Sequence, residues 1–205
     1  MSKSRVATIF LLLLLLTSLM SSCLNLEKVK RFRYEVTFKT EGETRTGFLE
    51  VSSFREGDKA RVKIDFALGE EQLSTTVDLE GDDISSAILP LVMGNPTLAT
   101  VLTPLGTVQG LIMAMSMGGA LQVGFKSTQT DDKGETMEIQ IPSSETRFGK
   151  EALWFESYVD GELAFRALIE KETFFPLVVD FRDPEILEAG QSQGYFEVKE
   201  MEWNE

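Results

Sequence analysis

The chain has 205 residues, and its 33 acidic against 20 basic residues give a net charge of −13. This acidic balance excludes a nucleic-acid-binding protein, because phosphate backbones are bound by Lys and Arg. The sequence contains no histidine and a single cysteine, so the usual general base, the Ser-His-Asp triad and the commonest zinc ligand are missing.

The N-terminus is built like an export signal. Lys3 and Arg5 form a basic start, residues 6–20 are an apolar run, and two serines precede Cys23. A transmembrane helix needs about 20 apolar residues, and this run is shorter. We therefore predict a signal peptide over residues 1–22. Without Lys3 and Arg5, the remaining 18 basic and 33 acidic residues give the mature chain a net charge of −15.

The end of this signal carries a recognisable motif, Leu19-Met20-Ser21-Ser22-Cys23. It resembles the lipobox of bacterial and archaeal lipoproteins, which implies that Cys23 receives a lipid and begins the mature chain. Cys23 is the only cysteine, so it has no intramolecular disulfide partner. The lipid would hold the protein to the extracytoplasmic face of a membrane. The second residue of the mature chain is then Leu24 and not Asp, which implies the outer membrane where the host has one. The alternatives are a plain signal peptide with a leftover cysteine and an uncleaved anchor.

Residues 23–31 are expected to form a tether between the lipid and the folded domain. Basic side chains cluster near it, at Lys28, Lys30, Arg31 and Arg33. Such a cluster is consistent with contact to lipid headgroups. It is also typical of the solvated face of a strand, which is the interpretation that a short charge run favours.

A first group of β-strands is predicted between residues 32 and 79. Apolar and polar side chains alternate there with the period of a half-buried strand, and turn signals separate the runs. The expected strands are 32–39, 44–54, 61–66 and 73–79. One apolar face per strand indicates an antiparallel meander. The side chains expected to face the core are Phe38, Val62, Ile64 and Phe66, and those expected to face solvent are Lys39, Arg61, Lys63 and Asp65.

A second group of strands is predicted in the C-terminal half. The dipeptide Asp160-Gly161 favours a tight hairpin, because both central positions of that turn need positive φ. Residues 184–194 are expected to form a loop or a short helix. The expected strands are 121–125, 137–141, 150–159, 162–169, 174–181 and 195–203.

The segment between the two groups is apolar, with no charged residue from Ile84 to Phe125. Asn95 is a good N-cap and Pro96 fits the first helical position, so a helix is expected to begin there and to end before Pro104. Thr107 is expected to cap a second helix that runs through Met117 and stops at two glycines. The helical insert is thus expected to span residues 84–119.

Three interpretations of this segment remain open. A helix that is apolar on all sides is typical of a buried core helix. The same composition suits a lid over an apolar cavity, in which methionines give adaptable contacts to a ligand such as an acyl chain. Membrane contact is the third, since residues 105–121 are marginally long enough to span. For a lid, the candidate ligand-lining residues are Leu102, Leu105, Leu111, Ile112, Met113, Met115 and Met117.

A short stretch near the C-terminus carries a second resemblance. Lys171-Glu172-Thr173-Phe174-Phe175-Pro176-Leu177 is similar to the Thr-Gly-x-Pro turn of the LolA-like lipoprotein-carrier superfamily, with Phe174 where that family has Gly. The order of export signal, strands, apolar helical insert and further strands also resembles that superfamily. The resemblance implies a curved, incomplete barrel whose helices plug an apolar cavity for acyl chains or other lipid.

Together these features predict an α+β, mostly β fold: a single domain over residues 32–205, with a curved antiparallel sheet and helices from the central apolar segment packed in its concave face. The predicted function is a membrane-tethered exported lipoprotein that binds an apolar ligand, a lipid or the acyl chain of a lipoprotein. The alternative is a structural or interaction lipoprotein whose acidic surface meets a protein partner. We predict no catalytic residue, no metal site, no cofactor and no nucleic-acid partner.

Overall fold

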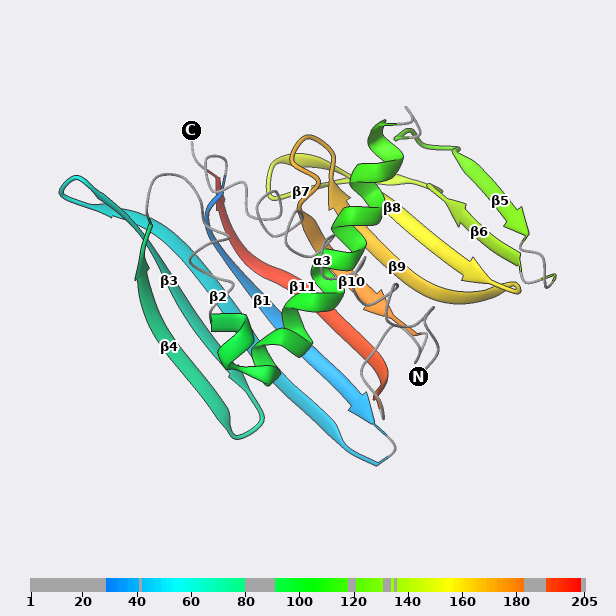
Figure 1. Ribbon diagram of the computed structural model, residues 1–205. Coiled ribbons are helices and arrows are strands. Elements are labelled where there is room, and N and C mark those ends of the chain that lie inside the picture. The colour runs from blue at the N-terminus through cyan, green and yellow to red at the C-terminus, as the bar shows by residue number, and fades with distance from the viewer. Residues whose placement is uncertain are drawn as a thin grey trace, which may run out of the picture.

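The computed structural model describes residues 29–40, 42–79, 91–117, 121–130, 134, 136–182 and 191–203. The described chain is mostly β, with eleven strands in one sheet and one long helix, α3 (Pro96–Met117), as Figure 1 shows. The strands are β1 (Val29–Thr40), β2 (Thr44–Glu56), β3 (Lys59–Leu68), β4 (Glu71–Asp78), β5 (Lys126–Thr130), β6 (Thr136–Gln140), β7 (Ser144–Arg147), β8 (Lys150–Val159), β9 (Glu162–Glu170), β10 (Pro176–Phe181) and β11 (Gln191–Trp203).

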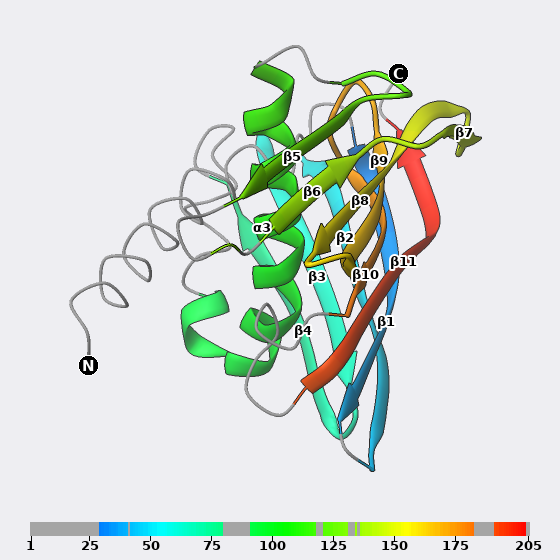
Figure 2. The same ribbon diagram turned by 90° about the vertical axis from the view of Figure 1, so that its right-hand side faces the viewer.

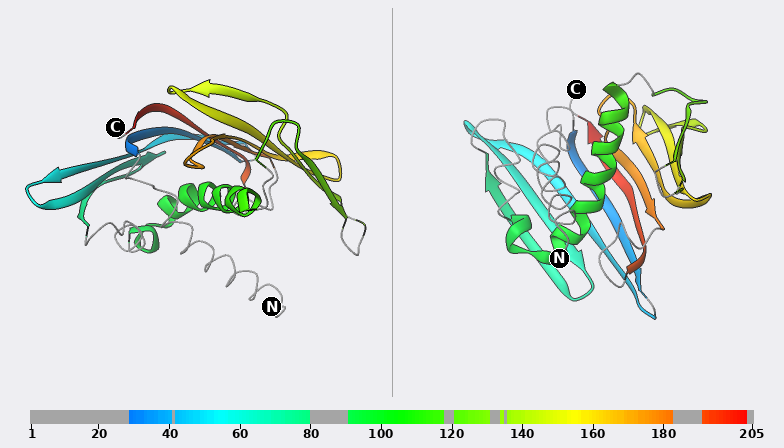
Figure 3. Two further views of the ribbon diagram at one scale, coloured as in Figure 1. Left: turned by 90° about the horizontal axis from the view of Figure 1, so that it is seen from above. Right: turned by 45° about the vertical axis from the view of Figure 1, so that its right-hand side comes forward.

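The strand order is β4-β3-β2-β1-β11-β10-β9-β8-β6-β5, and β7 pairs with β8 beside this path. All pairings are antiparallel. The last strand joins the two halves of the chain, because β11 lies between β1 and β10 and pairs along the whole length of β1. The sheet is curved and open, and in the described chain β4 and β5 are its two edges (Figure 3). A curved antiparallel sheet was predicted, and it is confirmed.

The predicted strand orientation is also confirmed. Phe38, Val62, Ile64 and Phe66 are at most 2% exposed and belong to one continuous buried cluster, as expected from their alternation. Lys39 and Lys63 are exposed, and Arg61 and Asp65 are half-exposed on the other face. Burial of each large apolar side chain contributes about 1.5–3 kcal/mol, so this face holds the sheet together.

One glycine permits a very close approach of two strands. A Cβ atom added to Gly47 of β2 would lie 1.9 Å from the carbonyl oxygen of Ala67 in β3. A side chain at this position would therefore displace one of the two backbones, and glycine is required where β2 and β3 come together.

The two predicted helices are in fact one, and the predicted break at Pro104 is wrong. Asn95 is the N-cap, as expected, because its Oδ1 accepts the N–H of Leu98 at 2.8 Å. The helix then continues through Pro104 to Met117. A helical Pro costs about 3 kcal/mol, but Leu98, Val101 and Val108 are at most 1% exposed and their burial together outweighs that cost. No described helix is both long and apolar enough to cross a membrane.

The strand predicted over residues 121–125 is wrong. Those residues form a turn in which Gly124 has φ +90° and its N–H donates to the Ile141 carbonyl at 2.9 Å, so β5 begins only at Lys126. Strand β7 was not predicted, because its sequence, Ser-Glu-Thr-Arg, has no apolar alternation. Residues 191–194, expected in a loop or a short helix, begin β11, and residues 184–190 of that expected segment lie outside the described residues.

The tether expected over residues 23–31 ends too late, because β1 begins at Val29, and the basic residues near it lie on a face of that strand. Arg31 pairs with Glu50 at 2.8 Å, Lys30 with Glu202 at 3.2 Å and Arg33 with Glu50 at 3.5 Å. Ion pairs with β2 and β11 therefore engage these side chains, which supports the interpretation as a solvated face over contact with headgroups. Lys28 lies outside the described residues.

Candidate functional site

Helix α3 lies along the concave side of the curved sheet, as Figures 2 and 3 show from two directions. Apolar residues three and four positions apart form one buried stripe along a single face of the helix, and Thr100, Pro104 and Gln109 outside this stripe are buried too. The residues of the stripe are Leu98, Val101, Leu105, Val108 and Ile112. They belong to the same buried cluster as the inward-facing residues of the sheet, so this face of the helix is part of the core.

The predicted ligand-lining residues fall into three groups. Leu105 and Ile112 are in the buried stripe. Leu102, Leu111 and Met115 are only partly buried and pack at the margin of the core. Leu111 and Met115 are one turn apart on one flank of α3, and helical geometry places Leu102 on the other flank. The side chains of Met113 and Met117, and the whole of Cys23, lie outside the described residues.

The sheet also leaves apolar side chains accessible beside the helix. Leu73 of β4 pairs with the inward-facing Phe66 and is only partly buried. Met137 of β6 is 42% exposed and pairs with Val159, which shares its face with the buried Ser157. Leu73 lies in the edge strand β4, and Met137 lies in β6, next to the edge strand β5. The concave side thus combines a core along its middle with partly exposed apolar margins.

The turn before β10 is built around a buried carboxylate. Glu170 is 1% exposed, and its carboxylate accepts the N–H of Glu172 at 3.0 Å and both the N–H and the hydroxyl of Thr173. Phe174 follows in the left-handed region, with φ +57°. The next ring, of Phe175, is buried on the concave side. The turn therefore fixes an aromatic side chain against the middle of the sheet.

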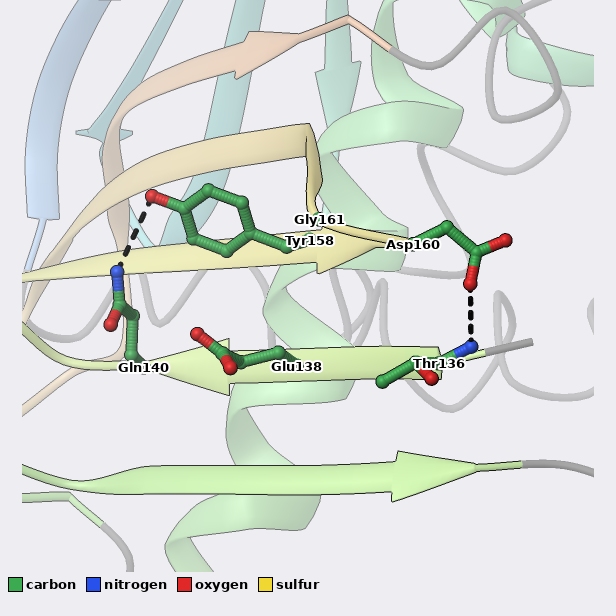
Figure 4. A pocket seen from close by; sticks show the side chains of 6 residues that line it. All are labelled: Thr136, Glu138, Gln140, Tyr158, Asp160 and Gly161. Carbon is green, nitrogen blue, oxygen red and sulfur yellow. Dashed lines mark hydrogen bonds between the residues drawn. The ribbon is translucent and has the colours of Figure 1, made fainter. Parts of the chain in front are cut away.

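A hollow of about 610 Å³ lies between β6 and β8, and it contains none of the predicted site residues. Its lining consists of Thr136, Glu138, Gln140, Tyr158, Asp160 and Gly161. Figure 4 shows the hollow with α3 behind the strands, so it opens on the face of the sheet opposite the helix. This agrees with the alternation of β8, in which Ser157 is buried and Tyr158 is half-exposed.

Hydrogen bonds fix the walls of this hollow. Asp160 and Gly161 have φ values of 49° and 82°, which confirms the predicted tight hairpin. The Asp160 carboxylate accepts the N–H of Thr136 at 2.8 Å, which ties the hairpin to β6. The Tyr158 hydroxyl donates to Glu156 at 2.8 Å and accepts from Gln140 Nε2 at 3.3 Å. The bond to Glu156, together with burial, raises the pKa of the Tyr158 phenol.

Sequence reasoning missed this hollow for a physical reason. Its two walls come from residues 136–140 and 158–161. These are brought together only because β6 pairs with β8, while β7 lies off the main strand order. The Asp160-Gly161 dipeptide was the one local signal, and it indicated a turn rather than a site. In the described ranges, no group of three or more Asp, Glu or Cys side chains is arranged to hold a metal ion.

No protein-family model and no curated protein sequence matches the chain. Among solved structures it is similar to the Pseudomonas aeruginosa MucA/MucB complex, with 10% identity and a TM-score of 0.31 over 93% of this chain and 57% of that one. It is also similar to a LolA superfamily protein from Nitrosomonas europaea, with 7% identity and a TM-score of 0.24 over 93% and 92%. The chain spans little more than half of the MucB chains. TM-scores in this range assign neither a family nor a function.

Proposed function

We propose that the protein is an exported, membrane-tethered lipoprotein that binds an apolar ligand of the acyl-chain type between the sheet and α3. The observation that carries the proposal is the partial exposure of Leu111 and Met115 on a helix that otherwise contributes to the core. A helix that served the core alone would need only its buried stripe to be apolar, with polar residues on its flanks. No residue of α3 is charged.

The sheet supports the same proposal. Leu73 and Met137 leave apolar surface on the concave side near both ends of the strand order. Apolar surface exposed to water costs about 25 cal/mol per Å², and an acyl chain lying against it would remove that cost. Methionine suits such a surface, because its flexible thioether adapts to different chain shapes. An N-terminal lipid on Cys23 would keep the site beside a membrane, where acyl chains are found.

Binding of a dansyl-labelled fatty acid tests this function. Met115→Asp should weaken binding at least about tenfold, because a carboxylate would be left without a partner against an acyl chain. Met93→Asp makes the same chemical change at a side chain that is 80% exposed, and it should leave the affinity unchanged. Both variants are compared by urea unfolding, so that a loss of binding is separated from a loss of structure.

The competing candidate is a structural lipoprotein in which α3 is simply core. The burial of Leu98, Val101 and Val108 to 1% or less favours it. Under that candidate the wild-type protein does not bind the fatty acid, and Met115→Asp lowers only the free energy of unfolding. Either failure of binding in the wild-type protein or equal loss in both Asp variants would overturn the acyl-chain proposal.

A further inference from the structure

The hollow between β6 and β8 is independent of acyl-chain binding, because it lies on the face of the sheet opposite α3 (Figure 4). Its volume of about 610 Å³ falls within the range of small-molecule sites in proteins. Its walls are held by the hydrogen bonds of Asp160 and Tyr158. A ligand entering it would therefore meet polar groups that are already oriented, which lowers the entropic cost of binding.

Two of the three carboxylates around the hollow are paired with basic side chains, and the third accepts a backbone hydrogen bond. Glu138 pairs with Lys126 at 2.8 Å, and one oxygen of Asp160 accepts the Thr136 N–H. Glu156, beside the hollow, accepts from Gln140 and Tyr158 and lies 3.3 Å from the Arg166 guanidinium. A cationic ligand would have to displace these partners. A neutral ligand would instead use the lone pairs that remain on each carboxylate, since a carboxylate offers about four acceptor positions.

The lining combines an aromatic ring with hydroxyl, amide and carboxylate groups. The ring of Tyr158 is half-exposed and offers an apolar surface to the C–H face of a sugar ring. Glu138 and Asp160 accept hydrogen bonds from hydroxyls, and so does the Gln140 amide oxygen, because the Gln140 N–H groups already donate to Glu156 and Tyr158. The Thr136 hydroxyl both donates and accepts. We propose that this hollow is a binding site for a short neutral saccharide.

Saturation-transfer NMR and calorimetry on the wild-type protein test the site with three sugars: maltose, cellobiose and N,N′-diacetylchitobiose. At least one should bind with a dissociation constant on the order of 1 mM, an affinity that a few hydrogen bonds and one aromatic contact provide. Tyr158→Leu and Gln140→Leu should each weaken binding at least about tenfold. Gln129→Leu is the matched control, because Gln129 pairs with the inward-facing Met137 and lies on the opposite face. It should leave binding unchanged.

Three results would overturn the proposal. The first is no transfer to any of the three sugars at about 50 mM, well above the expected dissociation constant. The second is binding that Tyr158→Leu and Gln140→Leu leave intact, which would place the sugar elsewhere. The third is a shift of the Tyr158 and Gln140 resonances on addition of putrescine, an organic dication, when no sugar shifts them. That result would make the hollow a cation site. Circular dichroism of each variant confirms that the sheet is intact.

Discussion

The phenol of Tyr34 donates a hydrogen bond to the backbone carbonyl of Pro176, and so joins β1 to the start of β10 across the intervening β11. Both groups are buried. The ring of Phe175 stacks on that of Tyr34, with centroids 6.0 Å apart and an angle of 17°, and meets Phe32 edge-on at 5.0 Å. This contact links the N-terminal and C-terminal halves of the sheet at the point where they were brought together by β11.

Removal of the Tyr34 hydroxyl should destabilise the protein measurably. Tyr34→Phe keeps the aromatic stack but leaves the Pro176 carbonyl without this donor in a buried position, which costs about 1–3 kcal/mol. Urea unfolding gives the change in the free energy of unfolding. Tyr158→Phe is the matched control, because the Tyr158 hydroxyl also donates a hydrogen bond but is partly exposed to water. An equal loss in both variants would contradict a special role for Tyr34.

The inward face of β3 supplies a second prediction. Ile64 is 2% exposed, and Ile64→Ala should cost about 2–5 kcal/mol through lost burial and a cavity. Lys63→Ala, at the next residue, should cost less than about 1 kcal/mol, because it removes only the exposed pair with Asp65. Urea unfolding of both variants compares the two faces of one strand. Similar losses at the two positions would show that the strand does not separate a core face from a solvent face.

Most strands were predictable because their side chains alternate and their turns carry local signals. The run from Phe32 to Lys39 and the hairpin at Asp160-Gly161 are such cases, and both appear in the structure. Each signal is contained within a few residues, so it needs no knowledge of distant parts of the chain. The pairing of Val29 with Trp203 has no such signal, because it depends on the packing of the whole sheet.

The failures have the opposite cause, since tertiary packing overrode the local preference. Pro104 predicts the end of a helix, yet burial of the residues around it keeps α3 continuous. The exposed strand β7 has no apolar pattern, and it exists because it pairs with β8. The hollow lined by Gln140 and Tyr158 could not be predicted either, because only the strand order brings its walls together.

At Phe174 we expect a Gly variant to be more stable than an Ala variant, which is the reverse of the usual order. With φ +57°, a side chain here costs roughly 1–2 kcal/mol that glycine avoids. Phe174→Gly and Phe174→Ala both lose the ring, so Phe174→Gly should be the more stable of the two by about 1 kcal/mol in thermal or urea unfolding.

Glu172, two residues earlier, is not among the residues with positive φ and is the control for this comparison. At that position the Ala variant should be more stable than the Gly variant, because glycine loses more conformational entropy on folding. The same order of stability at both positions would contradict backbone strain at Phe174.

Glu197 on β11 should make stability depend on acid. Burial raises its pKa, but hydrogen bonds from Lys199 at 2.5 Å and from Arg147 outweigh this and hold the pKa below its usual value. A depressed pKa stabilises the fold above the unfolded-state value of about 4.3, and this stabilisation is lost as pH falls through the folded-state value. Glu197→Gln should therefore cost about 1–3 kcal/mol at pH 7 and less at pH 3.

Urea unfolding from pH 7 to pH 3 measures this difference, with Glu200→Gln as the control. Glu200 pairs with Arg31 at 3.0 Å, but its side chain is 52% exposed, so its loss should cost less than about 1 kcal/mol at either pH. A gap between wild type and Glu197→Gln that stays constant with pH would show that the Glu197 charge does not produce the effect.

Cys23 decides whether the protein is tethered. Its thiol is the only attachment point for lipid in the chain, so Cys23→Ala should abolish incorporation of radiolabelled fatty acid and release the protein from the membrane fraction or leave it unprocessed. Ser22→Ala keeps a small residue before the cysteine and should retain the label. The folded domain should be unaffected in both variants, because both substitutions precede β1 (Val29–Thr40) in the sequence. Equal label in Cys23→Ala and wild type would overturn the proposal that the protein is a lipoprotein, and with it the proposal that the concave face works beside a membrane.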